Sequence, residues 1–128
     1  MKFKLIFLVL LFCFLYFIYC VLKVESSSVD SKAFIINSDL TQITKALNIH
    51  HEIYGFYPDE SRWRLVLTGD SYGIDGERII DSIPMDTYGE EYIYRYPSKC
   101  GRKDFDLYSK GENREDECGS GDDISFQF

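Results

Sequence analysis

An uninterrupted apolar run occupies the start of the chain. Residues 5–22 contain no charged side chain, with two lysines before them and Lys23 after them. A helix of this length spans roughly 27 Å, about the hydrocarbon thickness of a bilayer. The positive side chains at the front favour a cytoplasmic amino terminus. The pattern predicts a transmembrane signal anchor over residues 1–23 and one small globular domain over residues 24–128.

A cleaved signal peptide is the alternative interpretation of this run. No A-x-A-like cleavage site follows Tyr19, and Ser26 and Ser28 offer only poor ones. Cys20 follows the bulky Tyr19, whereas a lipoprotein cleavage site needs a small residue at that position. The uncleaved anchor is therefore the favoured interpretation.

Apolar residues with helical spacing follow the anchor. They recur at intervals of three and four, the pattern of a helix with one buried face. Ser38 suits the N-cap, Gly55 suits the helix end, and Pro58 prevents the helix from resuming. Because residues 33–36 are also apolar, the helix is expected to run on from the anchor, bent or interrupted around residues 26–28. The apolar face consists of Leu40, Ile43, Leu47, His50 and Tyr54.

The second half of the chain has shorter, strand-like patterns. Residues 58–67 predict a short helix. Apolar and aromatic residues predict strands over residues 92–96, 105–109 and 124–128. Because the strands follow the helices, the predicted fold class is α+β, with a long N-terminal helix packed on a small antiparallel sheet.

The net charge of the chain restricts the kinds of molecule that it is expected to bind. Three of the 14 basic residues lie in the anchor, so residues 24–128 combine 11 basic with 21 acidic residues, a formal charge of −10. Such an acidic surface disfavours nucleic acid, because phosphates are bound by positive charge. Metal cations and basic protein surfaces fit better.

The four cysteines fall into two pairs. Cys13 and Cys20 lie in the apolar run, where facing lipid is favoured over lining a helix-dimer seam. Cys100 and Cys118 are the only cysteines in residues 24–128, so a disulfide within this domain joins these two. An oxidising compartment favours the bridge, which would contribute about 3 kcal/mol by closing a loop.

Residues that often carry catalysis are sparse. His50 and His51 are adjacent on the predicted helix and point about 100° apart, so they do not easily share a metal ion. No nucleophile elbow or Gly-rich phosphate loop accompanies them. His50 is expected to be packed and His51 solvated. The sequence therefore favours a structural or binding role over an enzyme.

An acid-rich stretch near the carboxyl terminus is the main candidate for a metal site. Residues 110–123 contain six carboxylates, one asparagine and three glycines. Calcium takes about six to eight oxygens from carboxylates, amides and main-chain carbonyls. The stretch does not follow EF-hand spacing, and composition alone favours a solvated acidic loop.

Three motifs precede this stretch in the chain. They are GFYP at residues 55–58, IPMDTYGEEYIY at 83–94 and FDLYSKG at 105–111. Together with the acidic stretch, they resemble the major pseudopilin of type II secretion systems over about residues 38–125. That family reads G-x-Y-P, L-P-x-D-P-W-G-x-x-Y-x-Y and F-D-L-Y-S-x-G, followed by a glycine- and acid-rich loop ending in D-I.

The motif at residues 83–94 also has a local structural interpretation. Asp86 follows Pro84 in a turn and is placed to hydrogen-bond nearby backbone. Tyr92 and Tyr94 share one face of the predicted strand. These residues are expected to maintain the fold rather than to form a site.

The resemblance implies a membrane-anchored, pseudopilin-like structural subunit of type II secretion or a related pilus-like machine. Its partners would be other pilin-like or secretion-system proteins, with the anchor in the inner membrane and the C-terminal domain in the periplasm. The resemblance also implies that the acidic stretch binds Ca²⁺. Cys118 lies within this stretch and is not part of the family pattern, so a Cys100–Cys118 bridge is expected to take over part of the ordering. The implied ligands are the main-chain carbonyl of Lys110, Asn113 in place of a family aspartate, Asp122 and Asp123.

The amino-terminal region departs from the family pattern. Pseudopilins carry a glycine at the leader cleavage point and a glutamate at the fifth position of the apolar helix. Here no glycine precedes Gly55, and the apolar run contains no glutamate. We therefore expect the anchor to remain uncleaved. The alternative function is an anchored periplasmic interaction module that uses a pilin-like fold without filament assembly.

Overall fold

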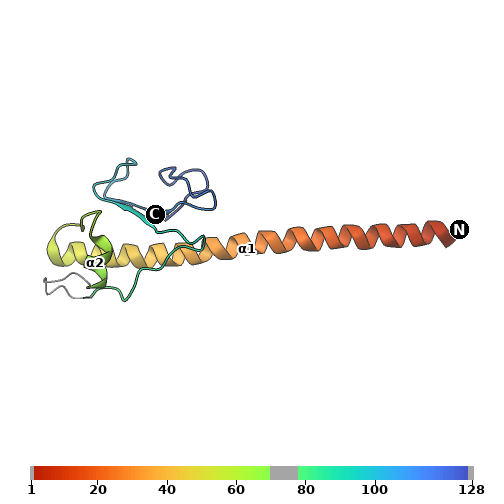
Figure 1. Ribbon diagram of the computed structural model, residues 1–128, viewed down its shortest axis with the longest axis horizontal. Coiled ribbons are helices and arrows are strands. Elements are labelled where there is room, and N and C mark those ends of the chain that lie inside the picture. The colour runs from red at the N-terminus through yellow and green to blue at the C-terminus, as the bar shows by residue number, and fades with distance from the viewer. Residues whose placement is uncertain (1, 70–77, 127–128) are drawn as a thin grey trace. The chain divides into compact units, whose positions relative to one another are not determined.

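The computed structural model describes residues 2–69 and 78–126 (Figure 1). The chain divides into two compact units, Met1–Ala33 and Phe34–Phe128. The elements are α1 (Lys2–Tyr54), α2 (Trp63–Thr68), β1 (Ile93–Arg95), β2 (Asp106–Ser109) and β3 (Ile124–Ser125).

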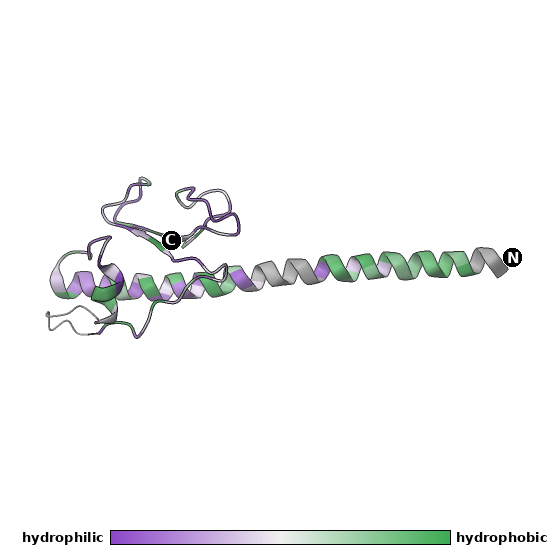
Figure 2. Cartoon of the chain, in the orientation of Figure 1, coloured by the Kyte–Doolittle hydropathy of each residue, from purple (hydrophilic) through white to green (hydrophobic). Residues whose placement is uncertain are grey.

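The first unit has an apolar helical surface. Over Ile6–Lys23, α1 is long and apolar enough to cross a membrane, and none of this stretch is buried (Figure 2). Cys13 lies exposed on it and Cys20 is half-buried, and neither forms a disulfide. This is the stretch that the sequence predicts as the anchor.

Helix α1 continues without interruption to Tyr54. The expectation that one helix runs on from the anchor is therefore confirmed, whereas an interruption at residues 26–28 and an N-cap at Ser38, which lies inside the helix, are wrong. Residues 2–54 contain neither glycine nor proline, and a serine inside a helix costs at most roughly 0.7 kcal/mol relative to alanine. A few serines are thus too weak a signal to break a helix.

Helix α1 ends where the sequence predicts, at Gly55. Gly55 has a positive φ of 81° and donates its N–H to the carbonyl of His51 at 2.8 Å. This left-handed residue closes the helix, as glycine commonly does. Helix α2 begins later than predicted, at Trp63, because the residues before it form a turn in which Arg62 N–H binds the carbonyl of Asp59 at 3.0 Å.

The sheet is antiparallel, with the order β1-β2-β3. Tyr94 pairs with Leu107, and Ser109 pairs with Ile124. The three strands lie within the predicted ranges but are shorter than predicted. Residues 127–128 of the predicted third strand lie outside the described residues.

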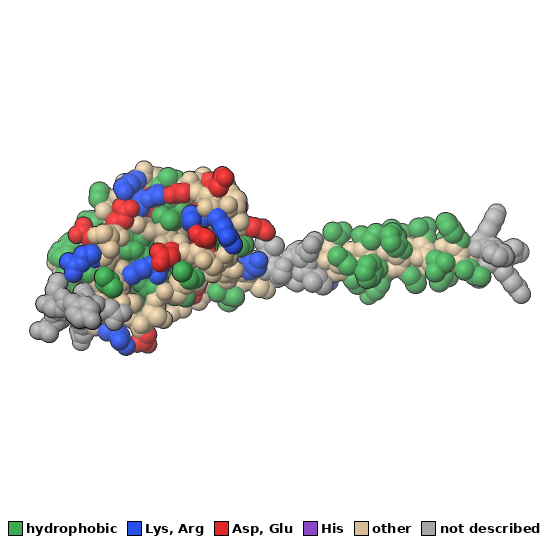
Figure 3. Space-filling model, viewed as in Figure 1, with side chains coloured by type: hydrophobic (Ala, Val, Ile, Leu, Met, Phe, Trp, Pro, Cys, Tyr) green, Lys and Arg blue, Asp and Glu red, His purple; other side chains and the backbone are tan. Residues whose placement is uncertain are grey.

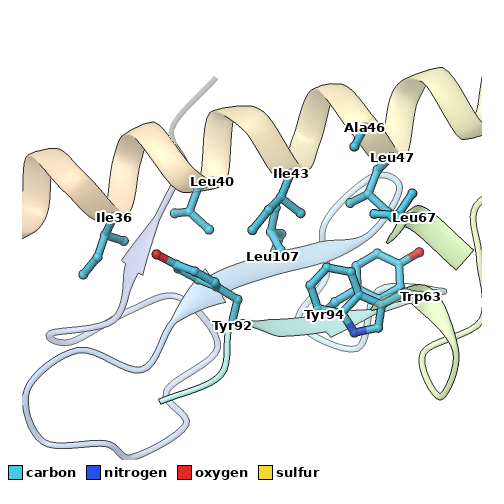
Figure 4. Packing of buried hydrophobic residues seen from close by; sticks show 10 residues of the cluster. All are labelled: Ile36, Leu40, Ile43, Ala46, Leu47, Trp63, Leu67, Tyr92, Tyr94 and Leu107. Carbon is cyan, nitrogen blue, oxygen red and sulfur yellow. The ribbon is translucent and has the colours of Figure 1, made fainter. Parts of the chain in front are cut away.

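The core lies between α1 and the sheet (Figure 4). Tyr92 and Tyr94 are both buried, as their alternation predicts. The predicted α+β class is confirmed. From α1 the core receives Ile36, Leu40, Ile43 and Leu47, which meet Leu107 of β2 and Trp63 and Leu67 of α2.

Candidate functional site

Residues 110–123, the acidic loop, connect β2 to β3. Because Ser109 pairs with Ile124, both ends of the loop are held at neighbouring positions of the sheet. The candidate ligands at the start of the loop therefore lie close to those at its end. The sheet register brings together residues that are about ten positions apart.

Asn113 and Asp122 are brought together across the loop. The backbone N–H of Asn113 donates to Asp122 Oδ2 at 2.9 Å. This hydrogen bond is the main cause of a lowered pKa of the Asp122 carboxyl. The side-chain oxygen of Asn113 accepts from the N–H of Glu115 at 2.7 Å. Two of the implied ligands thus lie side by side.

Asp123 is held by its own part of the loop. Its Oδ2 accepts from the N–H of Gly119 at 2.7 Å and of Glu117 at 3.0 Å. Its Oδ1 is buried and has no hydrogen-bond partner among the described residues. Burial raises the pKa of this carboxyl, while the two N–H donors act in the opposite direction. A fixed carboxylate with one unpartnered oxygen is chemically suited to a cation.

Gly111 allows the two sides of the loop to approach. Its φ is +67°, and a Cβ at this position would overlap the carbonyl oxygen of Asp122 and lie 2.8 Å from its Oδ2. Glycine is therefore required both for the backbone conformation and for the space. Lys110, beside it, directs its ammonium group to Glu90 at 2.9 Å.

The donor set fits calcium by chemistry and only in part by geometry. Two carboxylates, an amide oxygen and a main-chain carbonyl are hard oxygen ligands of the kind that calcium prefers. Within residues 2–69 and 78–126, however, no three His, Cys, Asp or Glu side chains gather as a metal group. Calcium at this loop would thus need amide and carbonyl oxygens besides Asp122 and Asp123.

Sequence reasoning missed a polar network that links the loop to strands β1 and β2. The Tyr108 hydroxyl donates to Asp116 Oδ1 at 2.5 Å, and the Arg95 guanidinium forms an ion pair with the same carboxylate. Arg95 also donates to the Tyr108 hydroxyl at 2.9 Å. The hydrogen bond from Tyr108 is the main reason for the lowered pKa of Asp116. Only the pairing of β1 with β2 reveals this network.

The Cys100–Cys118 disulfide is present in the structure, with a Cα–Cα distance of 5.4 Å. It joins the segment after β1 to the acidic loop. Cys118 N–H donates to Asp116 Oδ1 at 3.3 Å, so the bridge and the Asp116 network meet at one point. The loop is therefore tied to the sheet by covalent and ionic links.

The remaining polar residues that the sequence singles out are structural. His50 is 4% exposed, and its Nδ1 lies 2.9 Å from the carbonyl oxygen of Phe56. His51 is exposed and stacks on Tyr57. Asp86 is buried and accepts from the N–H groups of Tyr88 and Glu90. The packed histidine and the turn aspartate are thus confirmed.

Comparison with known proteins finds a matching family model and similar solved structures. A family model for protein G of the type II secretion system matches residues 23–127. The fold is similar to the crystal structure of the major pseudopilin from the type 2 secretion system of enterohaemorrhagic Escherichia coli. That match has a TM-score of 0.60 and 19% sequence identity, and covers 78% of this chain and 90% of that chain. No match is found among curated proteins.

Proposed function

The chain belongs to the protein G family of the type II secretion system and is a pseudopilin structural subunit of that machinery, and on this premise we propose its placement in the membrane and its calcium dependence. The first proposal is that residues 1–23 anchor the chain in the inner membrane and that residues 24–128 form the periplasmic domain. Its role is structural rather than catalytic. Its partners are other pilin-like or secretion-system proteins.

The Cys100–Cys118 disulfide supports the periplasmic placement. Disulfides persist in oxidising compartments and are rare in the cytosol. The apolar stretch Ile6–Lys23 supports the anchor, with two lysines before it on the side expected to stay cytoplasmic. In Figure 3, charged side chains are scattered over the visible face of the second unit, while the visible side of the apolar stretch carries hydrophobic side chains and no charged ones.

Protease protection tests this topology. Spheroplasts that express the full chain are treated with protease, with and without detergent. We expect the second unit to be digested in intact spheroplasts, leaving a short membrane-protected fragment. Full protection until detergent is added would contradict a periplasmic domain. Release of the chain by alkaline carbonate would contradict the anchor.

The second proposal is that calcium orders the acidic loop. Asn113, Asp122, Asp123 and the main-chain carbonyl of Lys110 would hold the ion, and the ion would neutralise the carboxylates gathered there. The unpartnered, buried Oδ1 of Asp123 is the observation that supports it. A bound ion would give this oxygen the partner that it lacks among the described residues.

Thermal unfolding of the full chain in detergent tests the calcium proposal. A ligand that binds only the folded form stabilises it by about 2.7 kcal/mol at a hundredfold excess over Kd. For a domain of this size, the melting temperature should rise by several degrees with calcium and much less with magnesium, which gives up water reluctantly. Asp123→Ala should abolish the calcium response, whereas Glu115→Ala, at an exposed position, should retain it. Equal melting temperatures with calcium, magnesium and chelator would overturn the proposal.

A further inference from the structure

The two cysteines of the Cys100–Cys118 disulfide lie in different surroundings within the second unit. Cys118 is exposed on the acidic loop, whereas Cys100, in the segment after β1, is half-buried. In thiol–disulfide exchange, an incoming thiolate attacks the sulfur that it can reach, and the other sulfur leaves with the electron pair. Exposure therefore favours attack at Cys118 and departure of Cys100.

A positive group lies against the sulfur of Cys100. Arg95 Nη1 is 3.4 Å from Cys100 Sγ, and the Tyr108 hydroxyl oxygen is 4.0 Å from it. Arg95 belongs to β1 and Tyr108 to β2, so the pairing of these strands holds both groups in place. A guanidinium group stabilises a neighbouring thiolate, and a stabilised thiolate leaves faster in exchange. The sheet thus makes Cys100 the better leaving group.

The charges near Cys118 are mainly of the opposite sign. Residues 115–117 are all acidic, and Asp116 Oδ1 accepts a hydrogen bond from the Cys118 N–H at 3.3 Å. Arg102 also reaches this side of the loop, but its Nε lies 3.9 Å from the buried Asp106 carboxylate. Carboxylates disfavour a thiolate beside them. Charge and exposure therefore indicate the same direction of exchange.

Cys118 also lies between the two backbone groups that hold Asp123. Its neighbours Glu117 and Gly119 donate their N–H groups to Asp123 Oδ2 at 3.0 and 2.7 Å. Cys118 itself has a φ of +59°, a left-handed conformation that residues other than glycine rarely adopt. The disulfide fixes this segment covalently, so an open bridge leaves Cys118 free to return to a more favourable conformation. The two N–H groups would then move away from Asp123.

We propose that Cys118 is a thiol-exchange site, and that opening of the Cys100–Cys118 bridge releases the acidic loop while the sheet stays folded. The reaction partner is a dithiol. Its first thiolate forms a bond to Cys118 Sγ, the bond between the two cysteines breaks, and the electron pair of that bond goes to Cys100 Sγ. The second thiolate of the partner then displaces Cys118 Sγ. The partner ends as a disulfide and the chain as two thiols, with two electrons and two protons transferred.

This site is independent of the calcium proposal, and a chelator is present in each measurement that tests it. Failure of the calcium response would therefore leave these results unaffected. The full chain in detergent is used throughout, with Cys13→Ser and Cys20→Ser to remove the two thiols of the apolar stretch.

Trapping of the mixed disulfide tests which sulfur is attacked. The oxidised protein reacts briefly with β-mercaptoethanol, a neutral monothiol, and free thiols are then blocked with N-ethylmaleimide. Peptide mapping should find the mercaptoethanol adduct on Cys118 and the maleimide on Cys100 in most of the opened molecules. Adducts mainly on Cys100, or equally on both, would overturn the assigned direction. Absence of any adduct under conditions that open the disulfide of a short peptide would overturn the exchange site.

Removal of the Arg95 charge tests the leaving group. Arg95→Gln should slow the opening of the bridge by dithiothreitol several-fold, whereas Arg95→Lys, which keeps the charge, should retain most of the rate. Lys99→Gln is the matched control, because it removes a positive charge next to Cys100 in the chain, and its ammonium group lies 2.8 Å from Glu60 instead. This control should react at the wild-type rate. A rate for Arg95→Gln that equals or exceeds that of Lys99→Gln would overturn the role of Arg95.

Amide hydrogen exchange tests the release of the loop. Reduction should speed the exchange of the Glu117 and Gly119 amides several-fold. The turn at Asp86 is the matched control, because its carboxylate holds the N–H groups of Tyr88 and Glu90 at 2.9 and 2.8 Å without a disulfide. These two amides should keep their exchange rates. Unchanged exchange in the loop would overturn the release. Equal acceleration in the loop and in the turn would also overturn it, because the whole second unit would then be loosened.

Discussion

Asp106, which has no exposed surface, accepts a hydrogen bond from the backbone N–H of Cys100 at 3.1 Å. The same carboxylate accepts from the N–H of Lys99 at 2.7 Å and from the hydroxyl of Ser98 at 2.6 Å. Strand β2 thereby fixes the cysteine that is bridged to the acidic loop. The bridge therefore connects the loop to a side chain that is buried in the core, in addition to the contacts of the loop with the sheet.

Asp106→Ala should therefore destabilise the whole second unit. It leaves three donors without their acceptor, and each lost hydrogen bond costs about 1 kcal/mol, more where the group remains buried. We expect a loss of about 3 kcal/mol in the free energy of unfolding, measured by urea titration of the full chain in detergent. Asp104→Ala, at an exposed position, is the control and should change it by less than about 0.5 kcal/mol. Equal effects would contradict the assigned role of Asp106.

Reduction of the Cys100–Cys118 bridge should lower stability by about 3 kcal/mol, because the bridge restricts the unfolded chain. The two cysteines are 18 positions apart. The urea midpoints of the oxidised and reduced protein should differ, while those of the Cys100→Ser/Cys118→Ser variant should not respond to reductant. An unchanged midpoint on reduction of the wild-type protein would show that the bridge adds no stability.

Gly111→Ala and Gly101→Ala form a matched pair. Both glycines have a positive φ, +67° and +77°, but a Cβ at Gly101 meets open space whereas one at Gly111 meets Asp122. Backbone strain of roughly 1–2 kcal/mol applies to both, and the overlap adds to it only at Gly111. We expect Gly111→Ala to be the more destabilising by at least about 1 kcal/mol and to weaken the calcium response. Equal losses would indicate that the loop moves aside freely.

Asp116 should contribute to acid unfolding. The hydrogen bond from Tyr108 and the ion pair with Arg95 lower its pKa in the folded state, relative to about 3.9 when unfolded. Its contribution is therefore fully present above the unfolded pKa and is lost as the pH falls through the lower, folded pKa. Unfolding free energies should consequently decline more steeply below about pH 4 in the wild type than in Asp116→Asn. Parallel pH profiles of the unfolding free energy for the wild type and Asp116→Asn would exclude this role. As a control, Glu115→Gln, at an exposed position, should show the same pH profile as the wild type.

Much of the fold follows from local sequence patterns. The apolar run, the helical spacing of Leu40, Ile43 and Leu47, and the end at Gly55 depend on periodicity and backbone preference, which act within a few residues. The alternation of Tyr92 and Tyr94 likewise predicted their common buried face. Three motifs followed by the acidic stretch also indicated the family, which the match over residues 23–127 confirms.

Tertiary structure decided the features that depend on which strands pair. The pairing of Ser109 with Ile124 brings Asn113 to Asp122, and the pairing of β1 with β2 brings Arg95 to Tyr108 and Asp116. Propensities do not encode such contacts, because they arise between positions far apart in the chain. The continuity of α1 through Ser38 also went against a local signal, since a weak N-cap preference does not interrupt an established helix. Local sequence thus determined the end of α1 and the buried faces of α1 and β1, and strand register determined which charged groups meet.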